Sequence, residues 1–123
     1  MVRRSLTALA AALVLGACVT PSIPIPPPEA ELMTFAVDVS AGAATFAYDP
    51  EPNFADAVVY VYNRDRGTGI ITTARSDGSV GPTAPFPAAF GENISITFET
   101  DEAIVGNCVQ IRDDGGLNPY CTR

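Results

Sequence analysis

Apolar and polar residues alternate along most of the chain from residue 32 onward, with the period of two that half-buried β-strands require. Clusters of Gly, Pro, Asn and Asp interrupt the alternation at short and fairly regular intervals. Strands are therefore predicted over residues 32–40, 43–49, 57–63, 69–75, 93–100 and about 107–112. The positions predicted to face inward are Met33, Phe35, Val37, Val39, Ala44, Phe46, Tyr48, Ile94, Ile96 and Phe98.

The segment Ala57–Asn63 gives the strongest strand signal, because it is dense in β-branched and aromatic residues. Both of its faces are apolar, which predicts a position between two other strands. Tyr60 and Tyr62 fall on one face, and together with Tyr48 they could form an exposed aromatic platform for a glycan or a peptide. Burial in the core is the simpler interpretation for aromatic residues at alternate strand positions.

Six to seven short strands at this spacing predict an all-β sandwich, with no helix expected after residue 31. Residues 82–90 carry three prolines and are expected to form an irregular connection. The turn Asp77-Gly78-Ser79, and the stretch Pro87–Glu92 before an alternating strand, resemble small immunoglobulin-like modules of bacterial surface proteins and lipoproteins. The resemblance implies an immunoglobulin-like β-sandwich over residues 32–123 that serves in spacing, adhesion or binding and has no catalytic activity.

The first 17 residues have the order of a secretory signal peptide: Arg3 and Arg4, an apolar run over residues 6–15, then Gly16 and Ala17. The apolar run is too short to span a bilayer. An N-terminal core helix is the alternative interpretation. A signal peptide places the remainder of the chain outside the cytoplasm.

Leu15-Gly16-Ala17-Cys18 resembles the lipobox of bacterial lipoproteins. The resemblance implies that Cys18 receives a diacylglycerol, that the preceding bond is cut and that the new amino terminus is acylated, as with palmitate. Two or more acyl chains hold a protein stably on a membrane. Val19 is not the Asp that retains the best-known lipoproteins at the inner membrane, so an outer-membrane location is expected. Loss of Cys18 with an ordinary signal peptide is the alternative.

Residues 18–31 contain five prolines and are predicted to be a linker between the lipidated cysteine and the domain. Such a segment favours the extended polyproline II conformation. At about 3.1 Å per residue, a dozen residues would span roughly 35 Å.

Cys108 and Cys121 are the two cysteines left once Cys18 is acylated, and an oxidising compartment favours a disulfide between them. Between them lies the stretch 113–119, which is rich in turn formers. Two cysteines in a chain without histidine make a poor zinc site.

The 123-residue chain contains no His and no Lys, which removes the usual general base and Schiff-base chemistry. Without residues 1–17 it has five Arg against 14 acidic residues, a net charge of −9. This charge disfavours nucleic acid, whose binding proteins need a basic surface. The expected partners are the membrane, through acylated Cys18, and an envelope protein or glycan.

The acidic residues concentrate in predicted loops, which makes calcium a candidate ligand because it prefers clustered carboxylate oxygens. A solvated acidic surface is the simpler alternative, and no cofactor is expected otherwise. The calcium candidates are Asp49, Glu51, Asp56, Asp101, Glu102, Asp113 and Asp114. The expected function is a non-enzymatic, lipid-anchored structural or binding module. The alternative is a small envelope enzyme or enzyme inhibitor that acts through surface carboxylates.

Overall fold

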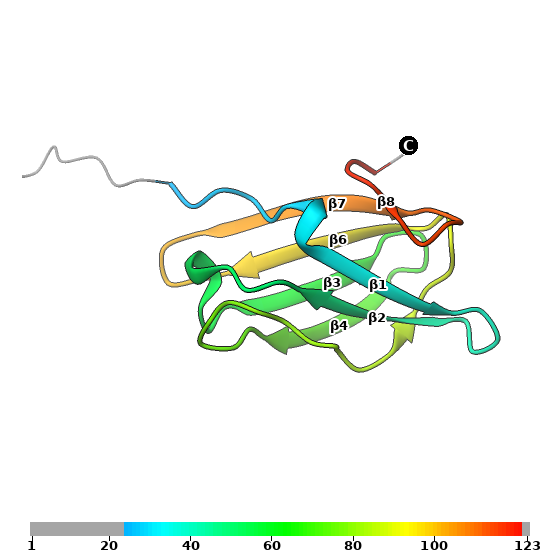
Figure 1. Ribbon diagram of the computed structural model, residues 1–123, viewed down its shortest axis with the longest axis horizontal. Helices are drawn as coiled ribbons and strands as arrows, with labels where there is room; N and C mark the ends of the chain where they lie inside the picture. The colour runs from blue at the N-terminus through cyan, green and yellow to red at the C-terminus, as the bar shows by residue number, and fades with distance from the viewer. Residues whose placement is uncertain (1–23, 122–123) are drawn as a thin grey trace, which may run out of the picture.

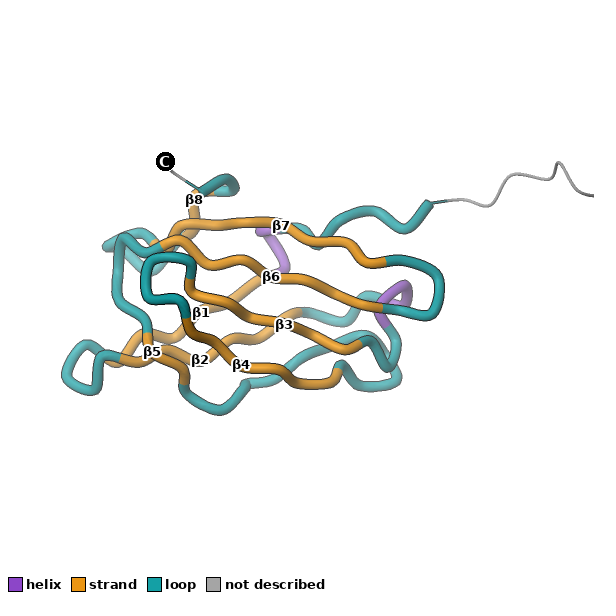
Figure 2. Tube along the Cα trace, turned by 180° about the vertical axis from the view of Figure 1, so that it is seen from behind, coloured by secondary structure: helices purple, strands orange, loops and turns teal. Residues whose placement is uncertain are grey.

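Two antiparallel β-sheets face each other across an aromatic core in the computed structural model, which describes residues 24–121 (Figure 1). Within this range the strands are β1 (Met33–Asp38), β2 (Ala43–Tyr48), β3 (Val58–Asn63), β4 (Thr68–Thr73), β5 (Phe86–Pro87), β6 (Asn93–Glu99), β7 (Ile104–Ile111) and β8 (Leu117–Asn118). One sheet has the order β1-β2-β5, and the other has the order β4-β3-β6-β7-β8. Figure 2 shows the five-stranded sheet from behind, with β7 and β4 on opposite sides of β6 and β3.

The alternating pattern sends one side chain in two into the space between the sheets. Phe35 and Phe46 lie opposite each other in the β1–β2 pair, with ring centroids 5.1 Å apart. In the other sheet Val59 lies opposite Phe98, and the Phe98 ring stacks on Phe54 at 4.2 Å. Burial of these side chains stabilises the fold by about 1.5–3 kcal/mol each.

The strand order is that of an immunoglobulin-like sandwich, as the sequence predicts. In that arrangement strands A, B and E form part of one sheet, and strands C, F and G belong to the other. Here β1, β2 and β5 occupy the first set of positions, while β3, β6 and β7 occupy the second. β4 lies beside β3, and β8 pairs with the far side of β7. The prediction that β3 has a neighbour on each side is confirmed.

Several local details differ from the sequence predictions. The connection expected to be irregular contains the two-residue strand β5, and β7 begins at Ile104 rather than near Asn107. Val39 is 73% exposed, because β1 ends at Asp38 and the chain turns there. The Asp38 carboxylate accepts hydrogen bonds from the Ser40 hydroxyl at 2.7 Å and the Ala41 N–H at 3.2 Å, which fixes this turn. Two short 3-10 helices, Ala30–Leu32 and Pro52–Phe54, complete the described range.

Part of the segment predicted as a linker packs on the domain. Pro28 is buried and Ile25 contacts the core. The Asn107 side-chain amide on β7 donates a 3.1 Å hydrogen bond to the Pro28 carbonyl, and the Glu29 N–H donates a 3.0 Å bond to the Tyr48 hydroxyl. Figure 1 shows this segment running along β7 before it enters β1. The packed unit therefore starts before residue 32.

Candidate functional site

The outer face of the five-stranded sheet presents Tyr60 and Tyr62 side by side on β3. Because Val59 and Val61 point into the core, the alternating tyrosines must point away from it. Tyr62 is 46% exposed, and Tyr60 is partly exposed. An aromatic side chain on a strand with partners on both sides is held rigidly, so it can present a preformed apolar surface to a ligand.

The neighbouring strand β4 leaves space beside these rings. Register places Ile71 opposite Tyr60 and Gly69 opposite Tyr62. A Cβ atom at position 69 would collide with the Val61 carbonyl oxygen, so this position requires glycine. A groove of about 520 Å³ follows β3 and β4 here, and Tyr60, Tyr62, Gly67, Gly69 and Ile71 are among its lining residues. Ile71 is 69% exposed, which makes this part of the face strongly apolar.

Tyr60 is fixed by a polar contact across the sheet. Its hydroxyl donates a 2.7 Å hydrogen bond to the Glu99 carboxylate on β6. This hydrogen bond raises the pKa of Tyr60 above its usual value, because loss of the phenolic proton would set two negative charges side by side. Glu99 therefore holds the ring at one end of the groove.

Tyr48, the third tyrosine of the possible platform, belongs to the core instead. It is 3% exposed, and its ring lies 5.0 Å from that of Phe98. Burial raises the pKa of its hydroxyl. The aromatic face therefore consists of Tyr60 and Tyr62 without Tyr48.

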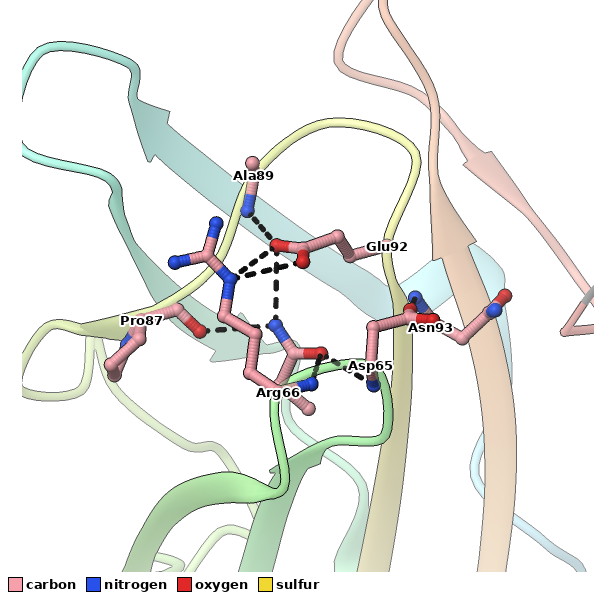
Figure 3. A network of polar contacts seen from close by, with 7 residues as sticks. Asp65, Arg66, Pro87, Ala89, Glu92 and Asn93 are labelled. Carbon is pink, nitrogen blue, oxygen red and sulfur yellow. Dashed lines mark hydrogen bonds and ion pairs between the residues drawn. The ribbon is translucent and has the colours of Figure 1, made fainter.

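A second polar cluster lies at the end of β3 and has a structural role (Figure 3). The buried Asn63 side chain donates to the Pro87 carbonyl at 3.1 Å and accepts from the Asp65 N–H at 3.0 Å. The Glu92 carboxylate accepts from the Arg66 Nε at 2.9 Å and from the Ala89 N–H at 2.5 Å. These bonds tie the turn after β3 to the turn before β6. The polar groups satisfy one another, as buried polar groups in stable folds generally do.

The acidic residues proposed for calcium are divided between the two ends of the sandwich. Glu99, at the end of β6, lies opposite Val58, at the start of β3. This register places Asp101 and Glu102 at the same end as the loop that precedes β3, which contains Asp49, Glu51 and Asp56. Asp113 and Asp114 follow β7 and lie at the opposite end, about 26 Å away for an eight-residue strand.

All seven acids therefore cannot converge on one ion. Within residues 24–121 no group of three or more Cys, Asp or Glu side chains is placed to hold a metal ion. Some of the carboxylates have partners within the chain: Asp114 accepts from Arg112 at 2.7 Å, and Glu51 accepts from the Asn53 N–H at 3.2 Å. Calcium binding remains a prediction for the acids at each end.

The disulfide predicted between Cys108 and Cys121 is present, with 5.2 Å between the two Cα atoms. It fastens the C-terminal segment to β7. Cys18 lies outside the described residues. No helix within the described range is both long and apolar enough to cross a membrane.

The sequence alone does not predict the groove, although it places Tyr60 and Tyr62 on one face as a possible aromatic platform. Gly69 and Ile71 were expected only as parts of a strand, and the pairing that brings them against the tyrosines depends on register. Comparison with protein-family models, with curated proteins and with solved structures finds no match to this chain. The features that bear on function are therefore the geometry of this face and the N-terminal sequence.

Proposed function

We propose that the protein is a lipid-anchored component of a bacterial envelope whose sandwich acts as a non-catalytic binding module. The anchor is Cys18, which follows the signal-peptide pattern and the Leu15-Gly16-Ala17 motif. Two or more acyl chains on this residue would give stable membrane attachment. An envelope protein or glycan is the expected partner.

The packing of Ile25 and Pro28 on the domain sets the length of the tether in this proposal. Pro24, the first described residue, is six positions after Cys18. An extended chain of that length reaches about 20 Å, compared with the roughly 35 Å expected for the whole proline-rich segment. The module would therefore be held close to the membrane surface.

The exposed apolar face around Tyr62 is the observation that carries the binding function. Tyr62 and Ile71 flank a groove, and neither side chain is needed to fill the core. Tyrosine is enriched in binding surfaces because its ring buries a large area at a small entropic cost. The sheet holds both residues in place before any partner arrives.

The anchor and the binding face are tested separately. Cys18→Ser should abolish fatty-acid labelling and shift the protein from the membrane fraction to the soluble fraction. Retention of this variant on membranes, together with an unlabelled wild type, would contradict the anchor.

Tyr62→Ala should reduce capture of envelope proteins or cell-wall glycan by the purified protein at least tenfold. Tyr120→Ala is the matched control, because Tyr120 is 76% exposed and lies away from the groove in the C-terminal segment. Equal capture by the wild type and both variants would contradict a binding role for this face.

A further inference from the structure

Among residues 24–121, strand β4 forms an edge of the five-stranded sheet, and no strand pairs with its backbone groups on one side. The Ala74 N–H donates to the Ala57 carbonyl, which sets the direction of every second residue along β4. Thr68, Ile70 and Thr72 therefore direct their N–H and C=O groups toward β3. Gly69, Ile71 and Thr73 direct theirs outward, and all three residues are exposed.

β4 also lacks the charge, proline and bulge that normally protect an edge strand, although β5 approaches it. Such strands usually carry a charged side chain, a proline or a bulge, or are covered by another segment. The sequence of β4, Thr-Gly-Ile-Ile-Thr-Thr, has no charge and no proline, and it pairs with β3 without interruption from Val58↔Thr73 to Asn63↔Thr68. No hydrogen bond from another segment of residues 24–121 reaches its outward-facing groups.

We propose that β4 pairs with β4 of a second copy of this chain, antiparallel and across a twofold axis at Ile71. The two five-stranded sheets then become one continuous sheet. Ile71 exchanges both backbone hydrogen bonds with Ile71 of the second copy, and Gly69 lies opposite Thr73 in each half. The inference goes beyond the binding function proposed above and does not depend on the lipid anchor.

In this register the side chains of β4 in one copy fit those of β4 in the other copy. Thr73 of the second copy lies next to Gly69, which has no side chain and lines the groove beside Tyr62. The two Ile71 side chains meet at the axis, each supported by its own Tyr60. Cross-strand pairs of β-branched and aromatic residues stabilise sheets.

Sedimentation equilibrium of the full chain carrying Cys18→Ser tests the proposal without lipid. At about 0.15 M salt, which screens the net charge, the mass should rise from that of one chain toward that of two between about 1 µM and 100 µM. Ile71→Lys should weaken self-association at least tenfold. Ile104→Lys is the matched control, because Ile104 is also 69% exposed but lies on β7, and this variant should associate as the parent does.

Ile71→Cys tests the register in the same background. Opposite residues that exchange backbone bonds have Cα atoms about 5.5 Å apart, which a disulfide can span. Mild oxidation should therefore link two Ile71→Cys chains, whereas Ile104→Cys chains should remain unlinked.

A monomer at every concentration would overturn the proposal, as would equal crosslinking of the two cysteine variants. If the β4 amides become protected from hydrogen exchange only after a different envelope protein is added, the edge binds that protein. This result would also overturn the proposal of self-pairing. Failure of the Tyr62→Ala capture experiment would leave the mass measurement unaffected, so the two proposals fail independently.

Discussion

The two edges of the five-stranded sheet differ in how far other segments of the chain cover them. The β7 edge is covered along part of its length by β8, by the Cys108–Cys121 disulfide and by the segment around Pro28. On the β4 edge no described residue pairs with the outward-facing backbone groups, although β5 approaches this strand and its six residues pair regularly with β3. Unpaired edge strands can form hydrogen bonds with a strand of another chain. The contrast therefore indicates that the β7 edge is largely closed to such pairing and that the β4 edge is open to it.

Asn107 shows how closely the β7 edge is capped. Its side-chain carbonyl accepts from the Cys108 N–H at 2.8 Å, while its side-chain amide donates to the Pro28 carbonyl at 3.1 Å. One residue thus satisfies a backbone donor at the edge and attaches the segment that lies across it. β8 continues the cover by pairing with Gln110 and Ile111.

Opening the closed edge should have the largest effect on stability. Replacing Cys108 and Cys121 together by serine removes a crosslink between residues 13 positions apart. The free energy of unfolding should fall by about 3 kcal/mol, because the unfolded chain regains the entropy of an open loop. Urea unfolding measures this change, and reduced wild type should match the variant. Unfolding midpoints that do not differ would contradict a structural role for the bridge.

Proline on alternate residues of β4 tests the direction of its backbone groups. Thr72→Pro should destabilise the monomer by about 2 kcal/mol, because it leaves a buried carbonyl on β3 without its donor. Ile71→Pro should destabilise it much less, since the Ile71 N–H faces the open edge. Urea unfolding at concentrations where the chain is monomeric gives the comparison. The reverse order of stability would show that the outward-facing residues have been assigned to the wrong set.

Changes at Asn107 should have an intermediate effect that separates its two hydrogen bonds. Asn107→Ala loses both and should lower the free energy of unfolding by about 1.5 kcal/mol. Asn107→Asp keeps an acceptor for the Cys108 N–H but cannot donate to Pro28 when ionised. Its free energy of unfolding should therefore fall by less than that of Asn107→Ala. Hydrogen exchange at Cys108 supplies a second readout and should accelerate only in Asn107→Ala. Acceleration in both variants would contradict this division of roles.

The smallest effect concerns the turn after β4. Hydrogen bonds from the Ser79 hydroxyl at 2.6 Å and the Ser79 N–H at 2.9 Å lower the pKa of Asp77. A carboxyl whose pKa is lower in the folded state stabilises the fold above its unfolded pKa of about 3.9 and loses that contribution as the pH falls further. Thermal midpoints should therefore drop slightly less between about pH 5 and pH 2 in Asp77→Asn than in the wild type. Equal changes of the thermal midpoint with pH in the two proteins would contradict a contribution of this turn to stability.

The sequence allowed the main strands to be predicted because their period is local. Phe35, Phe46 and Phe98 were placed inward from alternation alone, and all three are buried. β5 and β8 have two residues each, too few for a pattern, and form only because another strand lies beside them. The start of β7 was missed because Gly106 and the acidic stretch before it weaken the strand signal.

The candidate site was less accessible to prediction. Both faces of β3 are apolar in sequence, so only the position of the second sheet shows that Val59 faces inward and Tyr60 outward. Asn107 and Pro28 are 79 residues apart, and no local signal connects them. The open edge of β4 follows from strand order, a property of the whole chain.

Amide hydrogen exchange by NMR, followed as a function of protein concentration, tests the availability of the β4 edge most directly. The N–H groups of Gly69, Ile71 and Thr73 should become protected as the concentration rises, because each faces the second copy. Ile104 and Gly106, which are exposed on the β7 edge, should exchange at a constant rate. Rapid exchange of the three β4 amides at every concentration, or equal protection of the two β7 amides, would contradict the account.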